Sequence, residues 1–154
     1  VDSAVNLVAA QATENEILLS GHTDAYVDCI GWKLEEVLIN LLQNAIDASP
    51  RSCPIDVRLH QQGGELTVTV SDKGSGVSQT DRERIFEPFF TTKDVGEGTG
   101  LGLSISFGII EKHKGKIEVE SEMGVGTSFI ITLPIFISFN LFSISIISNQ
   151  LPNQ

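Results

Sequence analysis

Residues 33–49 read KLEEVLINLLQNAIDAS, and this stretch decides the fold. At a period of 3.6 residues its apolar side chains form one stripe, which predicts an amphipathic helix packed on a core. A second line is polar, and Asn is a mediocre helix former at such interior positions. This line is either a solvated face or a set of oxygen ligands for a phosphate and its hard cation, such as Mg²⁺. The stripe contains Leu34, Val37, Leu38, Leu41, Leu42, Ala45 and Ala48, and the polar line contains Glu36, Asn40, Asn44 and Asp47.

The composition fits a folded cytosolic domain. The chain has 154 residues, of which 41% are hydrophobic, and a formal net charge of −10, so it is long enough for a real core. The negative charge argues against nucleic acid or an anionic membrane as a partner, and any basic site must be local. Cys29 and Cys53 lack metal-ligand spacing and are expected to be reduced thiols. No apolar run reaches the length of about 18 residues that reads as a membrane span. We expect a cytoplasmic, monomeric domain cut from a longer protein, which itself can be anchored in the inner membrane.

Patterns along the rest of the chain predict an α+β fold. Strands alternate with helices and some are joined as hairpins, which indicates a mixed, mostly antiparallel sheet covered by helices on one face. Helices are expected within residues 1–13, over residues 33–49 and at Leu101–Lys112, with an irregular segment at Phe86–Gly100; strands are expected at Ile17–Ser20, Ala25–Ile30, Ile55–His60, Glu65–Ser71, Lys116–Val119 and Thr127–Leu133, the first two joined across Gly21–Asp24.

The last twenty residues differ in kind from the others. Residues 135–154 contain no charged residue, whereas 19% of the whole chain is charged. An exposed β-prone run of this sort is a liability unless it pairs with a sheet edge or another chain. We therefore expect one domain over residues 1–134, followed by a tail that is either foreign to the domain, through a reading-frame or expression artefact, or a docking strand.

Two glycine-rich motifs could bind a nucleotide. Asp72-Lys-Gly74-Ser-Gly76 follows a strand, where a carboxylate can accept from an exocyclic amine and glycines let a flat base approach the backbone, although such a motif is also a common turn. The segment from Gly96 to Gly102 reads GEGTGLG and opens a helix, so its backbone N–H groups can converge on anionic oxygens. It is neither a Walker loop nor a Rossmann fingerprint. Lys93 adds a positive charge to the same segment.

Five motifs follow one another in order along the chain: Asn40…Asn44, Asp72-x-Gly74-x-Gly76, Phe86-Glu-Pro-Phe-Phe90-Thr-Thr-Lys93, Gly98-x-Gly100-x-Gly102 and Gly124-x-Gly126-Thr127. In that order they resemble the N box, the first glycine box, the F box, and the second and third glycine boxes of the catalytic ATP-binding domain of bacterial sensor histidine kinases. The resemblance covers about residues 1–134. It implies the Bergerat fold, a two-layer α/β sandwich in which three helices back the sheet and a mobile lid covers ATP.

The resemblance also implies a role for each site residue. Asn44 would ligate Mg²⁺, with Asn40 and Asp47 beside it near the phosphates. Asp72 would hold the adenine amine, Gly74 and Gly76 would let the base approach, Val77 and Leu103 would wall it, and Thr127 would lie beneath it. Lys93 and the amides of Gly98, Thr99, Gly100, Leu101 and Gly102 would contact the phosphates. Residues 86–100 would form the lid, anchored by Phe86, Phe89 and Phe90.

One residue type favours a kinase over a hydrolase. In the hydrolytic relatives a Glu one turn before the magnesium ligand orients the attacking water, whereas this chain has Asn40 there. Asn is a poor proton acceptor, so the γ-phosphoryl group should be kept for another acceptor. Asn40 and Lys93 are thus the expected catalytic residues. A degenerate nucleotide-binding module, a gyrase-like ATPase and a serine kinase of the anti-sigma-factor type remain alternatives.

The phosphoacceptor is expected to lie outside this chain. The family phosphorylates a His followed by an acidic residue and then a Pro, and neither His22, His60 nor His113 has those neighbours. The expected function is therefore to bind Mg²⁺ and ATP and to phosphorylate a histidine on the dimerisation domain of the same parent kinase. A response regulator would act downstream.

Overall fold

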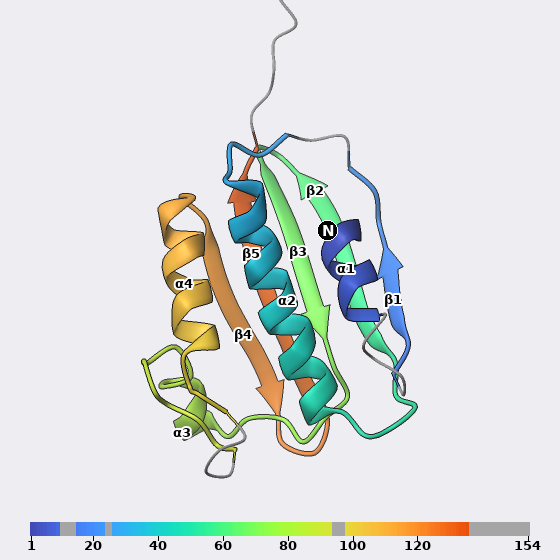
Figure 1. Ribbon diagram of the computed structural model, residues 1–154, viewed down its shortest axis with the longest axis vertical. Helices are drawn as coiled ribbons and strands as arrows, with labels where there is room; N and C mark the ends of the chain where they lie inside the picture. Colours follow the sequence, from blue (N-terminus) through green and yellow to red (C-terminus); the bar gives the residue numbers. More distant parts are fainter. Residues whose placement is uncertain (10–14, 24–25, 94–97, 136–154) are drawn as a thin grey trace, which may run out of the picture.

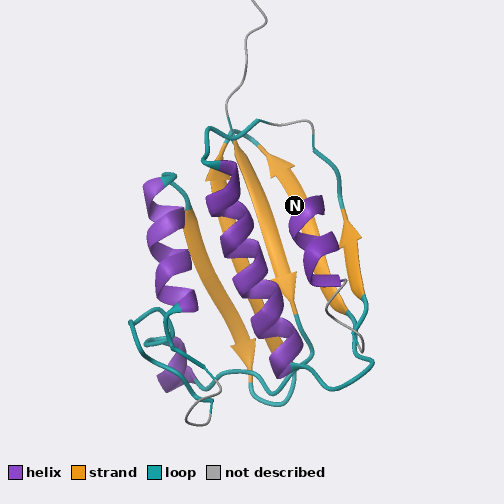
Figure 2. Ribbon diagram, viewed as in Figure 1, coloured by secondary structure: helices purple, strands orange, loops and turns teal. Residues whose placement is uncertain are grey.

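The computed structural model describes residues 1–9, 15–23, 26–93 and 98–135, which form one five-stranded sheet with helices on one face (Figures 1 and 2). The strand order is β1-β2-β3-β5-β4. The two-layer α+β architecture predicted from the sequence is confirmed. Its elements are α1 (Asp2–Ala9), β1 (Ile17–Ser20), α2 (Gly31–Ala48), β2 (Ile55–Gln62), β3 (Glu65–Ser71), α3 (Gln79–Arg82), α4 (Gly102–Lys112), β4 (Lys116–Glu122) and β5 (Gly126–Pro134).

Helix α2 crosses the middle of the sheet and buries most of the predicted apolar stripe, although Leu34 is only half-buried and Ala48, at the end of the helix, is exposed. Its fully buried side chains include Val37, Leu41 and Leu42, each at most 1% exposed. The helix ends at Ala48 because Ser49 precedes Pro50, and a residue before proline is driven out of the helical region; Ser49 has φ −83° and ψ 141°. Helices α1 and α4 flank α2 on the same face (Figure 1). Because α2 packs on the sheet, the polar line of this helix is held in a fixed position relative to the strands.

The antiparallel part of the sheet is specified by its alternating sequence. Leu66, Val68 and Val70 of β3 face the helices, and all are buried. Opposite them on β5 lie Leu133, Ile131 and Phe129 in direct register, and these are buried as well. A shift of one residue would move every one of these side chains to the open face, so the pairing is strongly fixed. The ends of β3 and β5 are thus held side by side, where the candidate site begins.

The predicted hairpin of Ile17–Ser20 with Ala25–Ile30 is wrong. Strand β1 instead pairs in parallel with β2, in the register of Ile17 with Ile55. The amide side chain of Asn15 donates to the carbonyls of Pro50 and Cys53, both at 2.9 Å, and so holds the start of β1 beside the start of β2. Residues 26–30 contain only an isolated bridge and lead into α2.

The remaining differences between the expected and observed elements are small. Strand β4 continues to Glu122, three residues past the predicted end, and the short helix α3 was not predicted. Ile135 packs against the core, and its N–H donates to the carbonyl of Gly64 at 2.9 Å. The predicted tail lies, from residue 136 onward, outside the described residues. Within the described part of the chain, no helix has the length and apolar character needed to cross a membrane.

Candidate functional site

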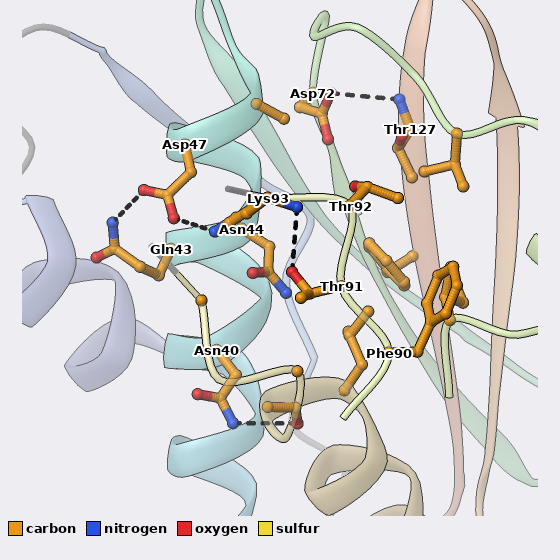
Figure 3. Close-up of a pocket in the computed structure, with 18 of the residues that line it drawn as sticks. Asn40, Gln43, Asn44, Asp47, Asp72, Phe90, Thr91, Thr92, Lys93 and Thr127 are labelled. Carbon is orange, nitrogen blue, oxygen red and sulfur yellow. Dashed lines mark hydrogen bonds and ion pairs between the residues drawn. The ribbon is translucent and has the colours of Figure 1, made fainter. Parts of the chain in front are cut away.

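A pocket of about 330 Å³ opens at the C-terminal end of α2, between that helix, the adjoining ends of β3 and β5, and the segment that leads into α4 (Figure 3). Four distant parts of the sequence meet there because the sheet places the end of β3 beside the start of β5. The lining residues are Asn40, Gln43, Asn44, Asp47, Ala48, Asp72, Ser75, Gly76, Val77, Ile85, Phe90, Thr91, Thr92, Lys93, Gly98, Thr99, Gly100, Gly102, Leu103, Thr127 and Phe129.

All of the site residues predicted from the sequence line this pocket except Gly74 and Leu101. The N–H of Gly74 donates to Oδ1 of Asp72 at 2.8 Å, so Gly74 supports the carboxylate from behind. Leu101 is the N-cap of α4, and its carbonyl accepts from the hydroxyl of Ser104 at 2.9 Å. Both residues therefore shape the site without lining it.

Asp72 forms the buried end of the pocket and is only 9% exposed. Its Oδ1 accepts from the backbone N–H of Gly74 at 2.8 Å and of Thr127 at 3.3 Å. Figure 3 shows the other carboxylate oxygen directed toward the pocket interior. Burial raises the pKa of the Asp72 carboxyl, and the hydrogen bonds from Gly74 and Thr127 act against that rise. A carboxylate fixed in this way can accept a hydrogen bond from an amine that enters the pocket.

Glycine is required where the β4–β5 hairpin approaches the Asp72 loop. Gly126 has φ +145°, and a Cβ there would lie 2.1 Å from the carbonyl oxygen of Asp72. Thr127 follows, is 6% exposed, and its hydroxyl lies 2.9 Å from that of Ser121. The Ser121 hydroxyl also accepts from the N–H of Val77 at 2.8 Å. The third glycine motif thus lets two loops pack closely enough to form a rigid floor.

The polar line of α2 forms the opposite wall, with Asn40, Asn44 and Asp47 on successive turns (Figure 3). The Asn40 amide donates to the carbonyl of Gly102 and to the hydroxyl of Ser106, both at 3.4 Å, and so links α2 to the start of α4. Glu36 does not line the pocket, and its carboxylate is paired with Lys33 at 2.9 Å.

The segment between β3 and α4 is anchored by two of its three predicted phenylalanines. Phe86 packs against the core, with its ring centroid 5.5 Å from that of Phe107, and Phe90 lines the pocket. The prediction that Phe89 is a third anchor is wrong, because its side chain is 74% exposed. Phe89 contributes through its backbone: it has φ +67°, and its N–H donates to the carbonyl of Gly100 at 2.9 Å. Residues 94–97 of the predicted lid lie outside the described residues.

Lys93 reaches across the mouth of the pocket to α2. Its ammonium forms an ion pair with Oδ2 of Asp47, and the side-chain amide of Gln43 donates to Oδ1 of the same carboxylate at 2.8 Å (Figure 3). Gln43 is a pocket residue that was not predicted from the sequence, although its spacing of four residues from Asp47 on a helix is a usable signal.

Several other lining residues were missed as site residues. Thr91 and Thr92 stand beside Lys93 in the predicted F box, and Phe129 belongs to the buried alternation of β5, so their positions could have been inferred from those patterns. Ser75 lies inside the first glycine motif. No sequence pattern singles out Ala48 or Ile85, which line the pocket only because the fold brings them there.

Comparisons with known proteins agree with this arrangement. The family described as histidine kinase-, DNA gyrase B-, and HSP90-like ATPase matches residues 31–137. Sporulation kinase A of Bacillus subtilis (strain 168) is 39% identical over 131 residues, which cover 83% of this chain and 21% of that protein. Sensor histidine kinase ZraS of Escherichia coli (strain K12) is 36% identical over 141 residues, which cover 90% of this chain and 30% of that protein. The chain thus spans less than a third of the length of these two curated relatives.

Solved structures give the same result. The catalytic domain of histidine kinase ThkA, in a nucleotide-free form, superposes with a TM-score of 0.76 at 34% identity, covering 86% of this chain and 88% of that one. Full-length ShkA in complex with AMPPNP gives a TM-score of 0.73 at 27% identity, covering 87% of this chain and 29% of that one. The chain therefore belongs to the histidine kinase-, DNA gyrase B- and HSP90-like ATPase family and, within it, to the histidine kinase catalytic domains.

Proposed function

We propose that this domain binds ATP with Mg²⁺ and donates the γ-phosphoryl group to a histidine on the dimerisation domain of its parent kinase. The observation that carries the proposal is the make-up of one pocket. A buried carboxylate, Asp72, lies at its closed end, and amides, glycines and Lys93 gather at its mouth. A nucleotide needs those two ends: an acceptor for the base amine, and N–H and cationic groups for the phosphates.

On this proposal each side chain has a defined task. Asp72 accepts from the adenine amine, with Thr127 beneath the base. Val77 and Leu103 supply the apolar walls. Lys93 and the backbone amides of residues 98–102 hold the phosphates, because helix N-termini and glycine-rich turns favour anions.

The donor set on α2 suits a hard cation that is bound together with phosphate. The side-chain oxygen of Asn44, with Asn40 and Asp47 one turn to either side, is the ligand type that Mg²⁺ prefers. Among the described residues there is no cluster of three His, Cys, Asp or Glu that could enclose a metal ion. Further ligands would thus come from phosphate and water, which is the usual arrangement for Mg²⁺ at a nucleotide. When bound, Mg²⁺ would neutralise charge on the phosphates.

Asn40 favours transfer over hydrolysis. Its amide is engaged with Gly102 and Ser106, and it offers no carboxylate that could orient an attacking water. Glu36, the nearest carboxylate toward the helix N-terminus, is held by Lys33. The amide at position 40 therefore disfavours a gyrase-like ATPase. A nucleotide-binding module without transfer can be distinguished from a kinase only by assay.

Two of the histidines, His60 and His113, make contacts that give them a structural role. Nε2 of His113 accepts from the N–H of Ile30 at 3.0 Å and its Nδ1 lies 2.7 Å from the carbonyl of Ile109, so both ring nitrogens are used at the end of α4. His60 lies within β2 with Nε2 3.4 Å from Oε1 of Gln62. These contacts support a phosphoacceptor on another domain. We further propose that the domain, residues 1–134, works as a monomer in the cytoplasm and that a response regulator accepts the phosphoryl group.

The test is transfer in trans. The chain is incubated with γ-labelled ATP and Mg²⁺, alone and with the separately produced acceptor hairpin of its parent kinase, with Asp72→Ala as the control. We expect acid-labile label on the hairpin, at a rate that saturates with hairpin concentration, and none on the chain alone or with the variant. ATP binding without transfer would make the domain a nucleotide-binding module. Stable label on His22, His60 or His113 would contradict the external acceptor.

A further inference from the structure

The carboxylate of Asp47 is fully engaged at the mouth of the pocket. One oxygen is paired with the ammonium of Lys93, and the other accepts from Gln43 at 2.8 Å. Gln43 and Asp47 both belong to α2, whereas Lys93 lies 46 positions further along the chain. The ion pair therefore joins two separate parts of the pocket wall.

Lys93 also has contacts within its own segment, through both its backbone and its side-chain stem. Its backbone N–H donates to the hydroxyl of Thr91 at 3.1 Å. A Cβ on Gly98 would lie 3.2 Å from Cδ of Lys93 and from that same hydroxyl, so Gly98 packs closely against the lysine stem. Lys93, Thr91 and Gly98 thus form one small unit that the ion pair attaches to α2.

Charge makes this pair consequential for phosphate binding. Lys93 is the single cation among the residues that line the pocket in the described part of the chain, and Asp47 and Asp72 are the acids. While the pair is formed, the described residues of the mouth offer phosphate no unpaired side-chain cation. Both partners are 35% exposed, and an ion pair so accessible to water is worth little by itself. A ligand with several negative charges can therefore displace it.

We propose that Asp47 is a positioning residue that holds Lys93 across the pocket mouth, and that the nucleotide enters by an exchange in which its phosphates take the lysine from Asp47. This inference rests on the proposed ATP site. The exchange frees a carboxylate one helical turn from Asn44. Unless a cation compensates it, that carboxylate repels the phosphates. Asp47 therefore makes tight nucleotide binding depend on a divalent cation. It also favours ligands with enough phosphate charge to displace Asp47 from its ion pair with Lys93.

The central variant is Asp47→Asn, which removes the charge but keeps the size. Glu36→Gln is its matched control, because it makes the same charge change on the same helix, in an ion pair outside the pocket. Calorimetry measures Kd for ATP with Mg²⁺ and with chelator. For Asp47→Asn we expect affinity in chelator to rise by about twofold to fivefold. The Kd in chelator divided by the Kd with Mg²⁺ should therefore fall. Glu36→Gln should match the wild type. Asp47→Glu keeps the carboxylate, so it should keep the wild-type dependence of ATP affinity on Mg²⁺.

A double-mutant cycle separates exchange from simple repulsion. If Asp47 acts by holding Lys93, the effect of Asp47→Asn on ATP affinity in chelator should shrink in a Lys93→Met background, because the competition for the lysine is gone. An effect of unchanged size in that background would mean direct repulsion alone and would overturn the inference.

Hydrogen exchange of the nucleotide-free protein tests the pair without any ligand. Amide exchange at Thr92 and Lys93 should be faster in Asp47→Asn than in the wild type and unchanged in Glu36→Gln. Equal exchange in all three proteins would overturn the inference even if ATP binds normally. If the wild type fails to bind ATP, the proposed function falls, while this measurement still decides whether the pair holds the segment.

Discussion

Asp72 determines which base the pocket can accept, because its two oxygens have different neighbours. Oδ1 is taken by the backbone N–H groups of Gly74 and Thr127, and the other oxygen faces the pocket. In Asp72→Asn the amide oxygen would have to take the Oδ1 place, since only an acceptor satisfies two donors. The new NH₂ group would then point into the pocket, where it opposes an amine and suits a carbonyl.

We therefore expect Asp72→Asn to reverse the preference for ATP over GTP, whereas Asp72→Ala should only erase it. A hydrogen bond to a charged group contributes about 1.5–3 kcal/mol, so the wild-type preference should exceed about tenfold. Competition binding with the two nucleotides measures this. A variant Asp72→Asn that still prefers ATP as the wild type does would remove Asp72 from base recognition.

The same residue predicts a pH dependence. Burial raises the pKa of Asp72 above that of an exposed carboxyl, so the buried charge destabilises the folded state above this raised pKa, and the cost is relieved as pH falls through it. ATP affinity should fall over the same interval, because the protonated carboxyl is a weaker acceptor. In Asp72→Asn that pH dependence of binding should be absent.

Asn44 should act on the cation rather than on the base. We expect Asn44→Ala to weaken binding of ATP with Mg²⁺ strongly and to leave binding in chelator nearly unchanged, because the proposed role of the side-chain oxygen is to bind the cation. The fold should be unaffected, since this side chain lies off the apolar stripe. Calorimetry in the two buffers is the measurement, and unfolding in urea verifies the fold. Equal affinity of variant and wild type for ATP with Mg²⁺ would take Asn44 out of the site.

At the scale of elements, the periodicity of apolar residues predicted the bounds of those helices and strands that local sequence determines. Helix α2 and strands β2, β3 and β5 were found within one or two residues of their expected bounds, because each buries one regular face. The partner of β1 could not be predicted, because Ile17–Ser20 is short and its pairing depends on Asn15 reaching carbonyls more than thirty positions away. Helix α3 was missed, although Ser78 followed by Asp81 is a capping pattern; the Ser78 hydroxyl accepts from the N–H of Asp81 at 3.1 Å.

The candidate site was predictable for a similar reason. Glycine motifs and the polar line of α2 are visible in sequence, because ligand contact requires those residue types at fixed spacing. The ion pair of Lys93 with Asp47 was not visible, since two residues 46 positions apart give no periodic signal. The exposure of Phe89 was also hidden, because an aromatic in a motif looks like a buried anchor until its backbone conformation is known.

At the scale of the whole molecule, stability depends on the single layer of side chains between α2 and the sheet. Leu41 is 0% exposed in that layer, so Leu41→Ala should lower the free energy of unfolding by about 2–5 kcal/mol. Leu7→Ala on α1 makes the same chemical change at a side chain that is 51% exposed, and it should cost much less. Urea unfolding of the three proteins is the test, and similar losses for the two variants would contradict this placement of the core.

The backbone hydrogen bond from the N–H of Phe89 to the carbonyl of Gly100 has a consequence for how the length of the segment between them can change. It closes the intervening segment at its base, where Gly100 has φ +67° and a Cβ would lie 2.5 Å from the Phe89 carbonyl carbon. The entropy of closing a loop grows only with the logarithm of its length, about 0.6 kcal/mol per doubling. A longer segment between these two residues would therefore cost little in loop-closure entropy, whereas any side chain at Gly100 would clash with the backbone of Phe89.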